Sequence, residues 1–168
     1  MKNLNPPLVS VLLPSYNHSE YIEEAILSVV NQTYSNIELI VIDDGSTDDS
    51  AYKIIKLQEK HEFLFVQQEN QGLISTLDTL FQLSKGKYIS LFSSDDVYHE
   101  QKLEKLVNFL ERNSDYSLVY SKIGIIDSDS NLVRKIEEPY QQGGIFCNLL
   151  NAEFFINGLS VLVKRNVY

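Results

Sequence analysis

Residues 40–48 read IVIDDGSTD, and residues 88–96 read YISLFSSDD. Each stretch begins as a run of β-branched or aromatic residues and ends in a pair of aspartates, at 43–44 and at 95–96. Such apolar runs are typical of buried strands in a parallel sheet. Ligands of open α/β sheets bind beyond the carboxyl ends of the strands. The two pairs therefore predict one acidic cleft, suited to a hard cation or to a ring of hydroxyl groups.

Strand and helix patterns alternate through the first two thirds of the chain, and three further strand-like runs follow. Apolar residues recur at helical spacing from Ile22 to Val30, and Ser19 is the expected N-cap of that helix. Repeated strand–helix–strand units predict a mostly parallel α/β sheet with helices on both faces. The expected strands are 8–14, 37–43, 63–68, 88–92, 118–126, 132–136 and 160–164. The expected helices are 22–30, 50–61, one after Gly72 with Leu73, Leu77, Leu80 and Phe81 on its apolar face, and 101–112.

Length and charge narrow the function classes. The chain has 168 residues, which is the size of one domain, and a formal net charge of -9. That charge argues against broad nucleic-acid binding, which needs a basic face, but allows a phosphorylated ligand that arrives with a cation. Cys147 is the only cysteine, so no intrachain disulfide can form. With no signal-peptide pattern and no apolar run long enough to span a membrane, a cytoplasmic location is expected.

The first aspartate pair favours a nucleoside site. A carboxylate at a strand end can accept hydrogen bonds from a base or a ribose, and Gly45 allows a tight turn beside it. The alternative is helix capping, which we expect Thr47 or Asp48 to perform because Asp43 and Asp44 lie too early. A phosphatase would need a second aspartate where Gly45 stands, and a response-regulator receiver would need a lysine after a late strand.

The second pair favours a divalent cation. Adjacent carboxylates repel unless a cation or hydrogen-bond donors lie between them, and oxygen-only ligands suit Mg²⁺ or Mn²⁺ bound to a diphosphate. The alternative is a capping role for the helix at 101–112. Tyr16, in the first strand–helix loop, is expected either to pack on a base or simply to pack within the loop. His18, His61 and His99 are expected to be solvated rather than ligands.

Taken in order, these segments resemble the inverting family 2 nucleotide-sugar glycosyltransferases of GT-A fold. The matching segments are 9–17 (VSVLLPSYN), 32–34 (QTY), 38–48 (ELIVIDDGSTD), 69–72 (ENQG), 86–89 (GKYI) and 95–96 (DD). The match is strong from Val9 to about Leu110. The resemblance implies one GT-A, Rossmann-like domain over 1–168, with a nucleotide-binding half at about 8–112 and the start of an acceptor-side half at about 113–168.

The resemblance also implies roles for single residues. The nucleotide would be held by Pro14, Tyr16, Asn17, Asp43, Asp44, Asn70, Gly72 and Asp95. Asp95 and Asp96 would bind the divalent cation, Mn²⁺ or Mg²⁺. The implied activity is transfer of a hexosyl group, with inversion, from a nucleotide-diphosphate donor, UDP-linked by family preference, to a hydroxyl of a glycan or lipid-linked acceptor. The implied setting is polysaccharide assembly in the cytoplasm, peripheral at the inner face of the membrane.

Three positions depart from the family pattern. Ser93 stands where the family often has the first aspartate of its metal motif, and Leu77 and Asp78 stand where it often has Arg-Asn. The family's catalytic base comes later in the chain, and we expect it beyond Tyr168 with the rest of the acceptor part. These departures leave open a nucleotide-sugar binding module without activity. A nucleotidyltransferase of related architecture would need a glycine-rich, basic loop at 15–19, and this segment contains neither glycine nor lysine.

Overall fold

The structure is a computed structural model that describes residues 6–136, 143–145, 148 and 156–167. Cys147 lies outside the described residues. Among the described residues, no helix combines the length and the apolar character that a bilayer crossing requires.

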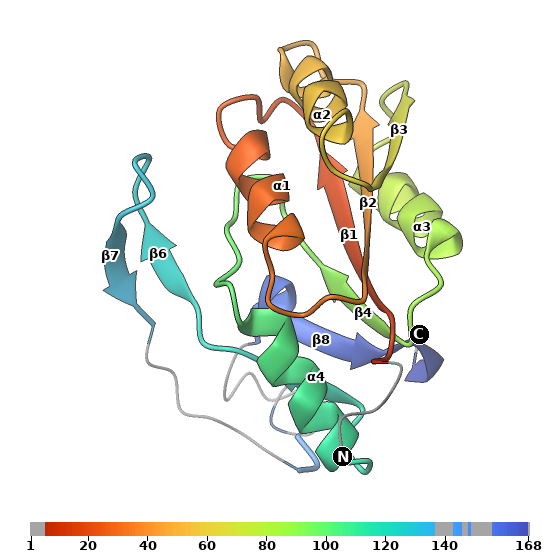
Figure 1. The fold of residues 1–168 in the computed structure, drawn as a ribbon, viewed down its shortest axis with the longest axis vertical. Coiled ribbons are helices and arrows are strands. Elements are labelled where there is room, and N and C mark those ends of the chain that lie inside the picture. The colour runs from red at the N-terminus through yellow and green to blue at the C-terminus, as the bar shows by residue number, and fades with distance from the viewer. Residues whose placement is uncertain (1–5, 137–142, 146–147, 149–155, 168) are drawn as a thin grey trace.

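Six strands form one sheet in the order β3-β2-β1-β4-β8-β5 (Figure 1). Strands β1 to β4 pair in parallel, whereas β8 runs antiparallel to both β4 and β5. The prediction of a mostly parallel sheet is therefore confirmed. The strands are β1 (Val9–Ser15), β2 (Ile37–Asp44), β3 (Leu64–Gln68), β4 (Tyr88–Leu91), β5 (Leu118–Tyr120) and β8 (Val161–Lys164).

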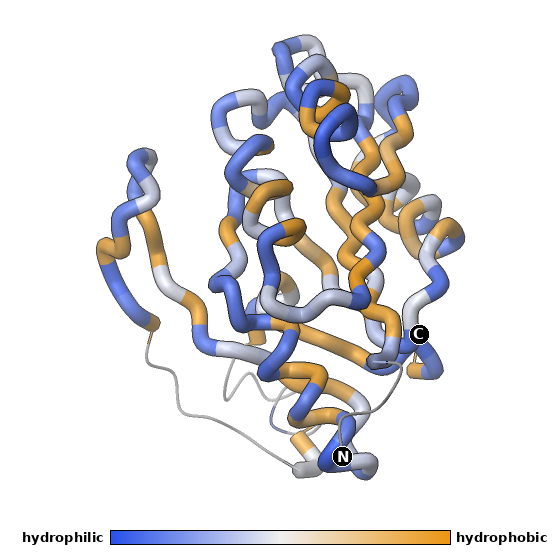
Figure 2. Tube along the Cα trace, viewed as in Figure 1, coloured by the Kyte–Doolittle hydropathy of each residue, from blue (hydrophilic) through white to orange (hydrophobic). Residues whose placement is uncertain are grey.

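Helices cover both faces of this sheet. Alternate residues of a strand face opposite sides. Val9, Val11 and Leu13 of β1 therefore pack in a core with α1, α2 and α4, while Leu12 packs on the other face with α3. Figure 2 shows the apolar residues running along the strands between these helices. Within residues 6–136 the helices are α1 (Ile22–Val30), α2 (Ser50–Gln58), α3 (Leu73–Leu83) and α4 (Lys102–Arg112), and within residues 156–167 the 3-10 turns are η1 (Gly158–Ser160) and η2 (Arg165–Val167).

The predicted single strand at 118–126 is wrong, because the chain forms two strands there. Strand β5 pairs with the short strand β8, and their ladder ends where Tyr120 faces Val161. Beyond it, β6 (Gly124–Ile126) pairs with β7 (Leu132–Lys135) as a separate hairpin that extends away from the main sheet (Figure 1). The Ser130 hydroxyl near its tip donates to Glu24 Oε2 of α1 at 2.5 Å.

Two details of the helices also differ from expectation. The first helix begins at Ile22 after Tyr21, with no side-chain cap, and the Ser19 N–H instead donates to Asp48 Oδ2 at 3.0 Å. Ser19 is therefore not the N-cap. In α3, Leu73 is 58% exposed, so the buried face starts later than expected, at Thr76 and Leu80.

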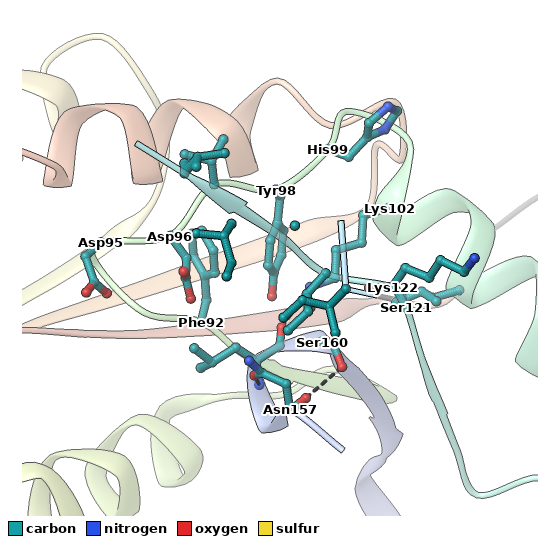
Figure 3. A pocket seen from close by; sticks show the side chains of 18 of the residues that line it. Phe92, Asp95, Asp96, Tyr98, His99, Lys102, Ser121, Lys122, Asn157 and Ser160 are labelled. Atoms are coloured by element: carbon teal, nitrogen blue, oxygen red, sulfur yellow. Dashed lines mark hydrogen bonds between the residues drawn. The ribbon is translucent and has the colours of Figure 1, made fainter. Parts of the chain in front are cut away.

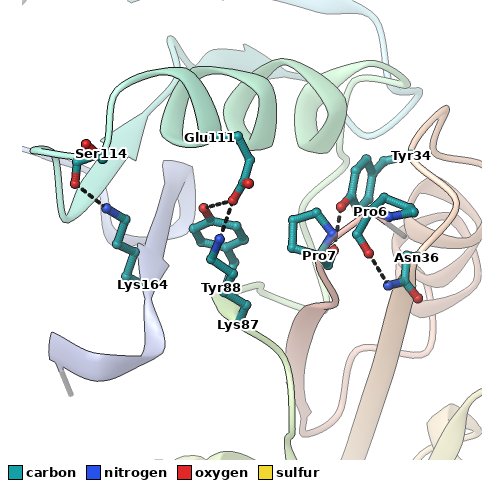
Figure 4. Close-up of polar contacts among 9 residues, drawn as sticks. All are labelled: Pro6, Pro7, Tyr34, Asn36, Lys87, Tyr88, Glu111, Ser114 and Lys164. Atoms are coloured by element: carbon teal, nitrogen blue, oxygen red, sulfur yellow. Dashed lines mark hydrogen bonds and ion pairs between the residues drawn. The ribbon is translucent and has the colours of Figure 1, made fainter. Parts of the chain in front are cut away.

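Polar contacts fasten the sheet at the amino ends of its parallel strands. The Tyr88 hydroxyl and the Lys87 ammonium both donate to Glu111 Oε1 of α4, each at 2.5 Å (Figure 4). The Tyr34 hydroxyl donates to the Pro7 carbonyl, and burial, reinforced by the Glu111 charge, raises the pKa of Tyr34 to about 12. Helix α4 is therefore tied to the start of β4.

Strand β1 is held in place at the same end by Glu38 of β2. Its Oε1 atom accepts hydrogen bonds from the Ser10 hydroxyl at 2.5 Å and from the Gly86 N–H at 2.8 Å. The Gly86 N–H also donates to Ser10 Oγ at 2.8 Å. A Cβ atom on Gly86 would lie 2.6 Å from the Ser10 nitrogen and 2.9 Å from the Leu8 carbonyl oxygen. Only glycine fits this approach of two backbones.

We predict that Gly86→Ala destabilises the protein by about 2–4 kcal/mol, because the methyl group would push apart β1 and the start of β4. Urea unfolding followed by circular dichroism measures the change. Gly158→Ala is the matched control, since a Cβ atom there meets nothing within 4 Å. Equal stability of the two variants would contradict this account of Gly86.

Candidate active site

Two loops at the carboxyl ends of β1 and β2 are joined through Asn17. Its N–H donates to Ser46 Oγ at 2.9 Å, and its Oδ1 accepts from the Thr47 N–H at 2.8 Å. Asn17 has a φ of 53°, a left-handed conformation that asparagine tolerates better than most residues. The side chain predicted to contact a nucleotide therefore also holds its own loop in shape.

Asp43 and Asp44 point to opposite faces of the sheet, because they are consecutive residues of β2. Asp43 is fully buried, and its carboxylate accepts from the Ser46 N–H at 3.0 Å and from the Ser46 hydroxyl at 2.5 Å. As expected, Asp43 lies too early to cap the next helix, since α2 begins at Ser50 after Asp49. The contacts of Asp43 stabilise the turn after β2.

Asp44 is 5% exposed and faces α3. Its Oδ1 accepts from Gln68 Nε2 and the Gln71 N–H, both at 2.8 Å, and its Oδ2 accepts from the Gly72 N–H at 2.9 Å. Burial acts to raise the pKa of Asp44, but these hydrogen bonds outweigh it and hold the pKa below its usual value. A carboxylate offers about four acceptor positions, so Oδ2 retains one for a ligand.

The turn from Asn70 to Gly72 lies directly against this carboxylate. A Cβ atom on Gly45, whose φ is 76°, would meet the Asn70 nitrogen at 2.8 Å, so the two loops touch. Gly72 has a φ of 83° and precedes α3. The structure thus brings the predicted residues of β2 and of the 70–72 turn together.

Pro14 and Tyr16 complete this end of the sheet. Pro14 is half-buried in β1 and pairs with Ile42 of β2. Tyr16 follows the strand and is 47% exposed. Its ring is therefore available to stack on a planar ligand at the mouth of the site.

The second aspartate pair lines a different space. Asp95 and Asp96 lie in the loop after β4, on the wall of a cavity of about 910 Å³ (Figure 3). Asp43 and Asp44 are not among its lining residues. The first pair is instead buried and hydrogen-bonded within the fold, and a single cleft shared by both pairs stays a prediction.

The Asp95–Asp96 pair has the chemistry of a cation site that a substrate completes. Burial, reinforced by the Asp95 charge, raises the pKa of Asp96. The Ser93 hydroxyl donates to Asp95 Oδ1. Within the described part of the chain, no group of three or more Asp, Glu, His or Cys side chains could hold a metal. Two carboxylates fit Mg²⁺ or Mn²⁺, which are commonly held by one or two carboxylates together with substrate phosphates.

The capping alternative for this pair is wrong. Helix α4 begins after Gln101 with no side-chain cap. Asp96 lies several residues earlier and makes no such contact. Neither Asp95 nor Asp96 caps the start of α4, and both side chains line the cavity.

His18 links the two parts of the site, which sequence analysis missed. Its Nδ1 lies 2.6 Å from the hydroxyl of buried Ser94, and its N–H donates to Ser50 Oγ at 3.0 Å. The expectation of a solvated side chain is therefore wrong. A lone histidine next to the loop asparagine gave no sign of a partner so distant in sequence.

Lys102 is the other residue that sequence analysis missed. Its Nζ donates to the Leu159 carbonyl at 2.8 Å and lies 3.5 Å from the centre of the Tyr98 ring. Burial lowers its pKa to about 7, against the opposing effect of the Asp96 charge. In the sequence it is one of two lysines on the amphipathic helix at 101–112, and nothing in the pattern indicates that it lines a cavity.

The family model described as "Glycosyl transferase family 2" matches residues 10–167. An uncharacterized glycosyltransferase of Haemophilus influenzae is 34% identical over 98% of this chain and 54% of its own length. The Escherichia coli protein WfgD, named as a UDP-Glc:alpha-D-GlcNAc-diphosphoundecaprenol beta-1,3-glucosyltransferase, is 31% identical over 95% of this chain and 61% of its own. The chain thus spans a little over half the length of these two relatives.

Solved structures show the same fold. Staphylococcus aureus TarS 1-349 in complex with UDP has a TM-score of 0.59 at 25% identity, over 63% of this chain and 32% of its own. The mannosyltransferase PcManGT from Pyrobaculum calidifontis, in complex with GDP-Man and Mn²⁺, has a TM-score of 0.64 at 24% identity, over 70% of this chain and 36% of its own. The second likeness concerns the fold alone.

We predict that Asp44→Asn destabilises the protein by about 2–3 kcal/mol at pH 7, because an amide group would face the N–H donors that the carboxylate now accepts. The lowered pKa of Asp44 means that its contribution is present above the unfolded pKa and is lost as pH falls through the folded value. The difference in free energy of unfolding between Asp44→Asn and the wild type should therefore become smaller below about pH 4. Urea unfolding at several pH values measures it.

Asp78→Asn, at an exposed position of α3, is the matched control and should leave stability within about 0.5 kcal/mol of wild type. A stability gap for Asp44→Asn that stayed constant down to pH 2 would contradict the role given to its charge.

Proposed function

Because the chain belongs to glycosyl transferase family 2, we propose that it binds a nucleotide-diphosphate sugar, with UDP as the nucleotide. We further propose that it transfers the hexosyl group, with inversion, to a hydroxyl of a glycan or lipid-linked acceptor in polysaccharide assembly. The name of WfgD and the UDP complex of TarS support this choice of donor. A cytoplasmic location, peripheral at the inner face of the membrane, stays a prediction.

The observation that carries the proposal is the Asp44 carboxylate. It stays ionised at neutral pH, it is fixed by three hydrogen bonds, and its Oδ2 keeps one acceptor position. A uracil ring has one N–H group, which could donate a hydrogen bond to this oxygen. In our proposal the base lies between Asp44 and the Tyr16 ring, with Asn17, Asn70 and Gly72 around it. Asp43 acts by holding the turn.

In the proposed reaction, an acceptor hydroxyl attacks the anomeric carbon from the face opposite the diphosphate. Asp95 and Asp96 would hold a divalent cation, which when bound would neutralise negative charge on the leaving diphosphate. His18 and Ser94 would keep the base-binding loop and the Asp95–Asp96 loop at a fixed separation. An acidic side chain elsewhere in the acceptor part would take the hydroxyl proton. We assign residues 8–112 to donor binding and 113–168 to the acceptor side.

A binding module without transfer activity is the second candidate. Ser93 stands at the first position of the expected metal motif, and its hydroxyl donates to Asp95 Oδ1. One carboxylate oxygen is therefore already engaged within the loop. This candidate predicts UDP binding without release of sugar from the donor.

We predict that the chain binds UDP in calorimetry with Mn²⁺ and binds it roughly tenfold more weakly, or not at all, in EDTA. Asp96→Asn should weaken Mn²⁺-dependent binding by a similar factor, because it removes one carboxylate ligand. Asp115→Asn, an exposed position after α4, is the matched control and should bind as wild type does.

Equal UDP affinity with Mn²⁺ and with EDTA would contradict the role of the Asp95–Asp96 pair. A folded chain that bound no UDP under either condition would contradict donor binding. Release of glucose from UDP-glucose by the chain would contradict the second candidate.

A further inference from the structure

The cavity beside Asp95 and Asp96 has a basic end that donor binding leaves unused. Its walls come from the loop after β4, the first turns of α4, residues 121–126 and residues 157–160. Lys102, Lys105 and Lys122 line it as well as the two aspartates. In Figure 3, Tyr98 lies between Asp96 and the Lys102 and Lys122 side chains. A chain with 23 acidic and 14 basic residues thus gathers three lysines in one cavity.

Lys102 is held in position by its surroundings. The short turn η1 fixes the Leu159 carbonyl that its Nζ contacts, because the Leu159 N–H donates to Asn157 Oδ1 at 2.9 Å. The Ser160 hydroxyl donates to the Asn157 carbonyl at 2.7 Å, as drawn in Figure 3. The ring of Tyr98 lies under the ammonium group at 3.5 Å. This cation is therefore built into the cavity wall rather than extended into solvent.

The ammonium group of Lys102 has capacity for a ligand. Among the described residues, no carboxylate lies within ion-pair distance of it. An ammonium carries three N–H donors, of which one meets the Leu159 carbonyl and one faces the Tyr98 ring. A partly buried cation without an anionic partner is costly, which is why burial lowers the pKa of Lys102 to about 7. An anion in the cavity would remove that cost.

We propose that Lys102, Lys105 and Lys122 bind a phosphate group of the acceptor, so that the acceptor is a phosphate-linked sugar. This inference rests on the proposed function, because it takes the cavity to be the acceptor side of that site. Several lysines around one space suit a multiply charged anion, which lysines attract as point charges. Ile123, Ile125 and Ile126 line the same cavity and offer an apolar wall beside the phosphate. A soluble sugar phosphate and a lipid diphosphate sugar share this chemistry.

The test uses three probes in calorimetry with EDTA at pH 6.5: inorganic pyrophosphate, glucose 1-phosphate and farnesyl diphosphate. We expect pyrophosphate to bind without metal. Lys102→Met should lower the affinity for pyrophosphate at least about tenfold, since the loss of a buried cation contact commonly lowers affinity by this factor or more. Lys122→Met should weaken it by a smaller factor. Lys60→Met, an exposed lysine beyond α2, removes the same charge elsewhere and should have no effect.

A parallel titration measures UDP with Mn²⁺ in the same variants, which separates this inference from the proposed function. Unchanged UDP affinity in Lys102→Met, together with weakened pyrophosphate, supports an acceptor phosphate site. Pyrophosphate binding without UDP binding would support the anion site while contradicting donor binding. Equal loss of both ligands would assign the lysines to the donor and overturn the inference. Pyrophosphate binding that is absent in wild type, or unaffected by either lysine variant, would also overturn it.

The remaining probes identify the source of the phosphate. Tighter binding of farnesyl diphosphate than of pyrophosphate would indicate a lipid-linked acceptor, because the isoleucine wall would then contribute. Tighter binding of glucose 1-phosphate would indicate a soluble sugar phosphate. If Lys102→Met fails to fold by circular dichroism, Lys122→Met decides the test, since Lys122 is exposed and the folding of this variant is checked in the same way.

Discussion

The register of β1 between its two parallel neighbours is the constraint on which the site depends. Glu38 of β2 accepts hydrogen bonds from Ser10 of β1 and from Gly86 before β4, and this fixes all three segments at one end. The carboxyl ends of β1 and β2 are then aligned with each other, and Asp43 lies opposite Ser15. Because of this alignment, the loops that follow β1, β2 and β4 lie within hydrogen-bond reach of one another, as Asn17 with Ser46 and His18 with Ser94 show.

Much of the fold could be predicted, because strands buried on both faces have continuous apolar sequences. The runs ending at Asp44 and Leu91 became β2 and β4 at nearly the expected bounds. The split of 118–126 could not be predicted, since it depends on the short length of β8, which lies some forty residues later. The exposure of Leu73 likewise depends on which residues pack against the start of α3, and helical periodicity does not contain that information.

For the site, sequence patterns located the acidic residues but not their partners. Asp44 and Asp96 were identified by type and position, whereas Gln68, which donates to Asp44, and Lys102, whose charge acts on Asp96 from beyond ion-pair distance, were not. Those partners are ordinary polar residues in sequence, and only tertiary packing gives them their roles. Strand alternation should have separated Asp43 from Asp44, because neighbouring residues of a strand face opposite sides of the sheet.

The central claim is that the nucleotide lies at the carboxyl ends of β1 and β2, with its diphosphate directed toward Asp95 and Asp96. A crystal structure of the chain with UDP and Mn²⁺ tests it most directly. The account predicts a uracil N–H within hydrogen-bond distance of Asp44 Oδ2, with the Tyr16 ring against the base. A nucleotide bound at the amino end of the sheet, near Lys87 and Lys164, or with its base at the lysine end of the cavity, would contradict it.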